Sequence, residues 1–303
     1  MSSAPAPHRA GPQSTDRPRY VEWAAGEQLA PWVDRYWCSG AAHSAPHHTR
    51  VLPDGCVDLV FDLAHADAPL VVGAMRRPLL VRHSGPVDIV GVRFRPGGAL
   101  PFLDVTLREL TDARVPLATF WGSEADAIVA ALRSGTGRDR VRHLERVLLL
   151  RRRARIAAGR EGELVGAAVN LLGAEHRPAA VREVVAALGI GQRGLERAFE
   201  RWVGLSPRVL ARVFRFQRLV RRIGDAAEAP RWAAVAAEAG YADQPHLIRD
   251  FRALAGITPA RFAVERRVGN VQDAAAAASS FRPSPASECS DERIEPTAAR
   301  RRA

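Results

Sequence analysis

The sequence predicts an α+β protein in which a β-rich, barrel-like N-terminal domain precedes an all-α C-terminal domain. Three observations lead to this fold class. Short apolar runs with period-two alternation occupy residues 20–122, helix-period patterns follow from residue 123, and one helical motif recurs after 52 residues. The recurrence predicts two helix-turn-helix motifs joined by a long helix, and 303 residues are enough for two such domains.

The chain is strongly basic, with a formal net charge of +11 and arginine as its only basic residue type apart from histidine. Guanidinium groups suit phosphates and guanine edges, so this composition permits a nucleic-acid partner, although the base composition of the genome would give the same bias. Three scattered cysteines cannot form a disulfide framework. Without a secretory signal or a membrane-spanning run, we expect a cytoplasmic protein that makes no membrane contact.

The first part of the chain predicts an arm followed by strands. Residues 1–19 are rich in proline and alanine and are expected to be disordered, and residues 20–122 are expected to form the β-rich sensor domain. Expected strands include Val51-Leu52, Cys56–Asp62, Leu70–Val72 and Val87–Phe94, with turns at Pro53-Asp54-Gly55 and Arg95–Gly98 and a helix that begins at Ala99. Asp54, Asp58 and Asp62 recur every four residues on one face, which we expect to be solvated.

Helical patterns occupy the remainder up to about residue 268. Residues 123–160 predict a helical connector, beginning at an N-capping Ser123 and continuing through apolar positions 141, 144, 147 and 148. Residues 161–268 form the second domain. Residues 269–303 are rich in alanine, serine and proline and predict a disordered tail that contains Cys289.

The repeated motif is the most informative feature of the chain. Both copies have a leucine, a phenylalanine four residues later, then a glycine and a Ser/Thr-Pro pair: Leu195-Glu-Arg-Ala-Phe199 with Gly204-Leu-Ser-Pro207, and Leu247-Ile-Arg-Asp-Phe251 with Gly256-Ile-Thr-Pro259. Leucine and phenylalanine at this spacing form a buried stripe, while glycine ends a helix and Ser/Thr-Pro begins the next.

Each copy predicts a short helix, a glycine turn and a second helix with polar residues at its N-terminal end. The first unit comprises Val181–Leu188, a turn from Gly189 to Gly191, and a helix at 192–202. The second comprises a short helix around Trp232–Ala236, a turn at Gly240-Tyr241, and a helix capped by Asp243 that runs to Ala255. This is helix-turn-helix anatomy, in which the second helix enters the major groove of DNA. A helical bundle duplicated for structural reasons is the alternative.

A predicted helix from Pro207 to Ile223 connects the two units. At 1.5 Å per residue it is about 25 Å long, so it could hold two recognition helices in successive major grooves about 34 Å apart. Its basic side suits contact with phosphates. We expect these contacts from Arg208, Arg212, Arg215 and Arg218.

Residues 180–262 resemble the DNA-binding domain of the AraC/XylS transcription regulators. The resemblance rests on the run Gly240-Tyr-Ala-Asp-Gln-Pro-His-Leu-Ile-Arg-Asp-Phe251 followed by Gly256-Ile-Thr-Pro259. It implies a transcription regulator with two helix-turn-helix motifs, attached to a sensing or dimerising domain. By position in that family, base contacts would come from Gln192, Arg193, Glu196 and Arg197 in the first unit and from Gln244, Pro245, His246 and Arg249 in the second.

The resemblance also implies partners. We expect promoter or operator DNA, RNA polymerase, and a small-molecule effector at the N-terminal domain, with the oligomeric state left open between monomer and homodimer. The run Leu52-Pro-Asp-Gly-Cys-Val-Asp-Leu-Val-Phe61 and the segment Gly91–Gly98 are similar to an uncharacterised β-rich domain fused to such regulators. That similarity suggests an architecture but no ligand, because function depends on the site.

Two other groups of residues suggest binding sites, but less strongly than the repeat does. Cys38, His43, His47, His48 and Cys56 fall within 19 residues, but their spacing matches no closed metal site. The segment Arg93–Gly98 before a helix could bind an anion, with a structural turn as the favoured interpretation. We expect no cofactor, no resident metal and no catalytic residues.

Two competing functions remain. One is a DNA repair, methyl-transfer, or metal- or redox-sensing protein that uses Cys38 or Cys56, which for transfer chemistry needs an activated thiolate. The other is a DNA-compacting protein without sequence preference. The favoured function is a transcription regulator that is not an enzyme.

Overall fold

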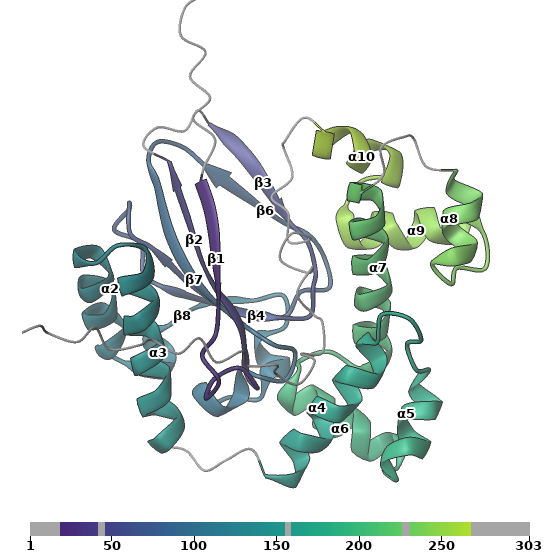
Figure 1. The fold of residues 1–303 in the computed structure, drawn as a ribbon, viewed down its shortest axis with the longest axis horizontal. Coiled ribbons are helices and arrows are strands. Elements are labelled where there is room, and N and C mark those ends of the chain that lie inside the picture. Colours follow the sequence, from purple (N-terminus) through teal and green to yellow (C-terminus); the bar gives the residue numbers. More distant parts are fainter. Residues whose placement is uncertain (1–18, 42–45, 155–158, 226–230, 268–303) are drawn as a thin grey trace, which may run out of the picture.

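The computed structural model describes residues 19–41, 46–154, 159–225 and 231–267, in which a sheet-containing N-terminal part precedes a helical C-terminal part (Figure 1). This arrangement confirms the predicted α+β class. The expected arm, up to residue 18, and the tail with Cys289 lie outside the described residues. None of the described helices combines the length and the apolar character needed to cross a membrane.

The main sheet has six antiparallel strands in the order β1-β2-β7-β4-β5-β8, and β3 pairs with β6 in a second, two-stranded sheet. The strands are β1 (Arg19–Ala24), β2 (Val33–Ala41), β3 (His47–Val51), β4 (Val57–Asp62), β5 (Leu70–Val72), β6 (Leu79–His83), β7 (Val87–Phe94) and β8 (Arg114–Pro116). The edge strands β1 and β8 each have one partner, so the main sheet is open and "barrel-like" describes it only loosely.

The N-terminal core lies between this sheet and the helices that follow it. Leu59 and Phe61 of β4 and Val92 and Phe94 of β7 are fully buried, as the alternation of apolar residues predicts. The helices are η1 (Leu100–Phe102), η2 (Leu107–Leu110), α1 (Ala118–Trp121), α2 (Glu124–Ser134) and α3 (Gly137–Ala154). Helices α2 and α3 cover one side of the sheet and share its core (Figure 1). The helix expected from Ala99 is only the short 3₁₀ helix η1.

The C-terminal part consists of helices around two smaller cores. They are α4 (Arg160–Gly173), α5 (Val181–Leu188), α6 (Gln192–Trp202), α7 (Pro207–Asp225), α8 (Trp232–Glu238), α9 (Gln244–Ala255) and α10 (Pro259–Arg267). Leu195 and Phe199 belong to the first core, and Leu247 and Phe251 to the second. All four are fully buried, as the repeat predicts. Helix α7 contributes side chains to both cores and joins them.

The N-terminal part supplies side chains to both C-terminal cores. Leu52, in the turn after β3, belongs to the second core, and Ala74, after β5, belongs to the first. The Leu52–Gly55 turn lies against α7, because a Cβ added to Gly55 would lie 2.5 Å from Leu210 Cδ1. The two parts of the chain therefore pack as one body along α7 rather than being joined by the connector alone.

Candidate nucleic-acid interface

The first unit is built from α5 and α6. Helix α5 ends at Gly189, whose φ of 61° is the left-handed conformation that glycine adopts without strain. Gly191 then takes the N-cap position, and α6 runs from Gln192 to Trp202, the predicted bounds. The helix stops at Gly204, where φ is 82° and an added Cβ would lie 2.6 Å from the carbonyl oxygen of Leu107.

The polar residues predicted for base contact lie at the accessible N-terminal part of α6. Gln192, Arg193 and Arg197 are exposed, and Glu196 is half-buried. The side-chain amide of Gln192 donates a hydrogen bond to Glu196 Oε1 at 3.0 Å, one helical turn along. The opposite face of α6 packs into the first core, so its polar side is free to meet a partner.

The second unit is built from α8 and α9. Asp243 caps α9 by accepting a hydrogen bond from the backbone N–H of His246 at 2.6 Å. Pro245 stands in the first turn, where its missing N–H costs no helical hydrogen bond. Gly256 ends the helix with a φ of 73°, so the start and the stop of α9 are those that the sequence predicts.

The predicted contact residues of α9 do not all have the same surroundings. Gln244, Pro245 and Arg249 are exposed. His246 is half-buried, and its ring packs edge-on against Tyr241 at 5.3 Å while its Nδ1 accepts a 3.4 Å hydrogen bond from the backbone of Ala242. His246 therefore helps to form the turn before α9 in addition to standing at the helix entrance.

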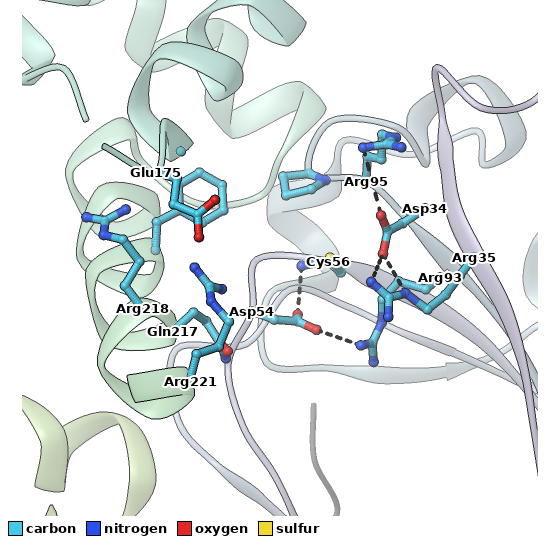
Figure 2. A pocket seen from close by; sticks show the side chains of 13 residues that line it. Asp34, Arg35, Asp54, Cys56, Arg93, Arg95, Glu175, Gln217, Arg218 and Arg221 are labelled. Atoms are coloured by element: carbon cyan, nitrogen blue, oxygen red, sulfur yellow. Dashed lines mark hydrogen bonds and ion pairs between the residues drawn. The ribbon is translucent and has the colours of Figure 1, made fainter. Parts of the chain in front are cut away.

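The arginines of α7 have four different environments rather than one basic side. Arg208 is exposed at the start of the helix. Arg212 and Arg215 pair with Asp250 of α9, and Arg222 pairs with Glu238 of α8. Arg218 and Arg221 reach into a cleft between α7 and the N-terminal domain (Figure 2). Of the four arginines predicted to contact phosphate, only Arg208 stands clear of such neighbours.

Asp250 is the centre of a network that orients α9. Its carboxylate is 93% buried, receives Arg212, lies 3.5 Å from Arg215 and accepts a 3.2 Å hydrogen bond from the Tyr241 hydroxyl. Arg215 also stacks over the Tyr241 ring at 4.5 Å. Burial, followed by the charge of Asp250, raises the pKa of Tyr241 to about 12, so the hydroxyl remains a donor to Asp250.

The Asp54–Asp58 face is not solvated, in contrast to the expectation from sequence. Asp58 is buried and forms a two-point pair with Arg93, whose atoms lie 3.0 and 3.1 Å from the two carboxylate oxygens. Arg93 also lies 3.2 Å from Asp54, whose other oxygen accepts the backbone N–H of Cys56. These pairs stiffen the turn that contacts α7, and they occupy Arg93 within its own domain.

Cys38 and Cys56 lack the surroundings of a reactive thiolate. Burial raises the pKa of Cys38 to about 11 and also raises that of Cys56, for which nearby aspartates add to the effect. The described side chains contain no group of three His, Cys, Asp or Glu that could hold a metal. Of the proposed ligand cluster, His43 and the side chain of His47 lie outside the described residues.

The geometry of both units agrees with the comparisons to protein families. Residues 184–264 match a family described as "Helix-turn-helix domain", which spans both units and α7. The match therefore identifies the C-terminal domain as a helix-turn-helix domain. Residues 22–116 match a second family, described as "Domain of unknown function (DUF6597)".

Two solved structures illustrate the limited similarity of the chain to known structures. A Chromobacterium violaceum transcriptional regulator described as AraC-type has 22% identity and a TM-score of 0.32, covering 34% of this chain and 92% of its own. ToxT from Vibrio cholerae has 9% identity and a TM-score of 0.37, covering 82% of this chain and 97% of its own. No protein with a curated description matches the chain.

Sequence reasoning located the second helix of each unit but missed the neighbours of α7. The pairing of Arg212 with Asp250 joins residues 38 positions apart, and nothing local to α7 indicates it. One signal was present: besides Leu210 and Val213, the helix has Phe216 and Leu219, which are also fully buried. Apolar residues on more than one side of a helix indicate that it is covered on more than one side.

Proposed function

We propose that the chain is a sequence-specific DNA-binding transcription regulator whose N-terminal domain modulates its AraC-type domain. The observation that carries this proposal is the accessibility of matching positions in the two units. Arg193 and Arg197 on α6, and Gln244 and Arg249 on α9, are exposed where each second helix begins, while the opposite face of each helix is buried.

The proposed base contacts are the residues predicted from sequence, and the exposed ones are the main candidates. Arg193, Arg197 and Arg249 have the planar donor fork that reads guanine, and Gln192 and Gln244 suit adenine. Glu196, Pro245 and His246 complete the set at the edge of each helix entrance. Because the two units carry different residues at these positions, one protomer is expected to read a non-palindromic site.

The proposed phosphate contacts centre on Arg208. It is exposed at the start of α7, next to the first unit. Arg212 and Arg215 are secondary candidates for phosphate contact. They pair with Asp250, but their side chains are still 38% and 28% exposed. Arg218 is a weaker candidate because it reaches toward the N-terminal domain instead (Figure 2).

Control by the N-terminal domain is supported by direct contacts to both units. Thr111 Oγ1 donates a 2.6 Å hydrogen bond to the carbonyl oxygen of Gly204, just after α6. At the other unit, Arg50 Nη1 donates a 3.0 Å hydrogen bond to the carbonyl oxygen of Ala255, the last residue of α9. A shift of the N-terminal domain would therefore displace the C-terminal ends of both recognition helices. The binding of an effector, of RNA polymerase and of a second copy of the chain remains a prediction.

The competing functions have less support. Thiol-based repair or transfer needs a depressed thiol pKa, whereas the pKa values of Cys38 and Cys56 are raised. DNA compaction without sequence preference needs only phosphate contacts, and it does not account for the exposed glutamine side chain at each helix entrance, Gln192 and Gln244.

Substitution at the two recognition helices tests the function. A binding site is first selected from a random duplex pool with the full chain. We expect Arg197→Ala and Arg249→Ala each to weaken binding to this site by about 1–3 kcal/mol and to relax the base preference of one half of it. Fluorescence anisotropy at fixed salt measures both effects.

Arg138→Ala is the matched control. Arg138 is exposed on α3, away from both units, so its loss changes the net charge equally but should leave specific affinity unchanged. Wild-type affinity in both recognition-helix variants, or equal affinity of the parent protein for all duplexes, would contradict the proposal.

A further inference from the structure

The N-terminal domain touches the same glycine in both helix-turn-helix units. Gly204 follows α6 and Gly256 follows α9, at matching positions of the 52-residue repeat, and both have a positive φ. A Cβ added to Gly204 would lie 2.6 Å from the carbonyl oxygen of Leu107, and one added to Gly256 would lie 3.2 Å from both Arg50 Nη1 and Pro78 Cγ. Each repeated glycine therefore ends a helix and also leaves room for the N-terminal domain.

The end of a helix does not by itself need such a neighbour. Gly189 and Gly240 follow the first helix of each unit and have positive φ values of 61° and 76°, but nothing lies within 4 Å of an added Cβ at either position. The contacts with the N-terminal domain are thus made at the recognition helices and not at every glycine turn of the repeat.

At the first unit the contact is made by backbone and is rigid. The carbonyl group of Leu107, in η2, lies against Gly204, and Leu107 itself is buried in the N-terminal core. The Thr111 hydroxyl donates a 2.6 Å hydrogen bond to the carbonyl oxygen of Gly204, and Arg108 pairs with Glu200 of α6 at 3.1 Å. Separation at this point would require η2 to leave the N-terminal core, so the contact holds the end of α6 firmly to the N-terminal domain.

At the second unit the contact depends on one side chain. Arg50 Nη1 donates a 3.0 Å hydrogen bond to the carbonyl oxygen of Ala255, and Nη2 lies 3.7 Å from Glu265 Oε2 of α10. A guanidinium at this place caps the C-terminal end of α9, where carbonyl groups lack helical partners and the helix dipole favours a cation. However, Arg50 Nε is buried without a hydrogen-bond partner among the described residues. Water would satisfy this N–H if the side chain withdrew, which makes the contact easier to release.

The two strands that carry Arg50 are weakly packed. In the described part of the chain, β3 and β6 pair with each other and with no strand of the main sheet. Strand β6 has no buried residue, and Leu80, which lies opposite Arg50, is 54% exposed. A segment with few buried side chains opens at a lower free-energy cost than the core does. Because β3 ends next to Leu52, which is buried in the second core, Arg50 can withdraw from α9 while the Leu52–Gly55 turn stays on α7.

We propose that Arg50 is a positioning residue of the second recognition helix, and that the N-terminal domain regulates DNA reading through this contact. The first unit stays fixed to η2, whereas the second keeps its DNA-reading orientation only while Arg50 caps α9. A change in the N-terminal domain therefore acts on one half of the DNA site and leaves the other half unaltered. The effect on DNA rests on the proposed function, whereas the contact between the domains does not.

Hydrogen exchange, measured by mass spectrometry on the full chain without DNA, tests the contact itself. In Arg50→Gln the last turn of α9 loses its cap, so we expect the amides of residues 250–257 to exchange at least about threefold faster, while those of residues 198–205 at the end of α6 do not change. Arg82→Gln is the matched control, because Arg82 is exposed on β6 and gives the same charge change on the same pair of strands. It should leave both segments as in the parent protein. Equal exchange of residues 250–257 in the two variants overturns the proposal.

DNA binding tests the positioning role. The half-site read by α9 is the one whose base preference Arg249→Ala relaxes. We expect Arg50→Gln to weaken binding to the full site about three- to tenfold, and to leave binding unchanged on a duplex in which that half-site is scrambled. Arg82→Gln should change binding to either duplex by less than about twofold. Equal weakening on both duplexes, or faster exchange without weaker binding to the full site, overturns the positioning role. If no duplex is selected at all, the proposed function fails, and hydrogen exchange still decides whether Arg50 holds α9.

Thr111→Val tests the difference between the two contacts. It removes the hydroxyl that donates to Gly204 and keeps the shape of the side chain. Because the backbone of Leu107 and the Arg108–Glu200 pair still hold α6, we expect less than about a twofold loss of affinity at the half-site read by α6. A loss there as large as that of Arg50→Gln at the other half-site would show that both contacts are equally releasable, and it overturns the assignment of regulation to the second unit.

Discussion

At the scale of single residues, Asp250 shows how the protein uses arginines that resemble a phosphate-binding stripe. Its buried carboxylate joins Arg212 and Arg215 of α7 to the recognition helix α9 and to Tyr241 of the turn before it. The same three groups therefore set the angle at which α9 leaves the core. A mutation at this position should act on the second unit's stability and, through its orientation, on DNA affinity.

Replacing Asp250 with Asn keeps the shape and removes the charge. Because two guanidinium groups then lose their buried partner, we expect the free energy of unfolding to fall by about 1–3 kcal/mol, at the low end of buried-pair losses since Arg212 remains 38% exposed. Urea denaturation followed by circular dichroism measures the change. Asp139→Asn, in the exposed pair with Arg142, is the control and should change stability by less than about 0.5 kcal/mol. If both variants lose the same free energy of unfolding, the Asp250 network stabilises the protein no more than an exposed ion pair does.

At the scale of elements, the Leu52–Gly55 turn is the point where the N-terminal domain meets α7. Gly55 has a φ of 84°, and an added Cβ would lie 2.5 Å from Leu210 Cδ1. Gly85, in the turn between β6 and β7, has nearly the same φ of 83° but nothing within 4 Å of an added Cβ. A side chain at either position would strain the backbone equally, but only at Gly55 would it also collide with Leu210.

This pair separates backbone strain from the contact with α7. We expect Gly85→Ala to cost about 1–2 kcal/mol of stability and to leave DNA affinity unchanged. Gly55→Ala should cost more, by a further 1–3 kcal/mol or so, because Leu210 must move, and it should change DNA affinity. Thermal denaturation and anisotropy measure the two quantities. If the variants behave alike in both assays, the turn does not communicate with α7.

The elements themselves were largely predictable, whereas their contacts were not. Local chemistry sets the ends of α6 and α9: a positive-φ glycine follows each, and Asp243 caps the second. Strands β5 and β7 also occupy the two short apolar runs that the sequence predicts as strands. By contrast, the burial of Asp58 against Arg93 depends on the pairing of β4 with β7, and the entry of Glu175 into the cleft depends on how α4 packs. Such long-range pairings leave no mark on one local stretch of sequence.

At the scale of the whole molecule, the arrangement of the two units should fix the spacing of the DNA site. The units lie at opposite ends of α7, and α5 and α8 project to the same side of it, away from the sheet (Figure 1). The helix has 19 residues, which gives a length of about 28 Å at 1.5 Å per residue. Packing of the N-terminal domain along α7 and onto both cores opposes bending of this rod.

A rigid connection makes a distinctive prediction for altered binding sites. Inserting five base pairs between the two half-sites turns the second major groove to the opposite face of the DNA, while inserting ten restores the face but moves the groove about 34 Å farther away. A flexible linker would tolerate the second change. For this protein we expect both insertions to reduce affinity to that of a single half-site. In Arg249→Ala, whose second unit contributes little, the insertions should cost much less. Recovery of affinity with ten inserted base pairs would show that α7 does not hold the two recognition helices at a fixed distance.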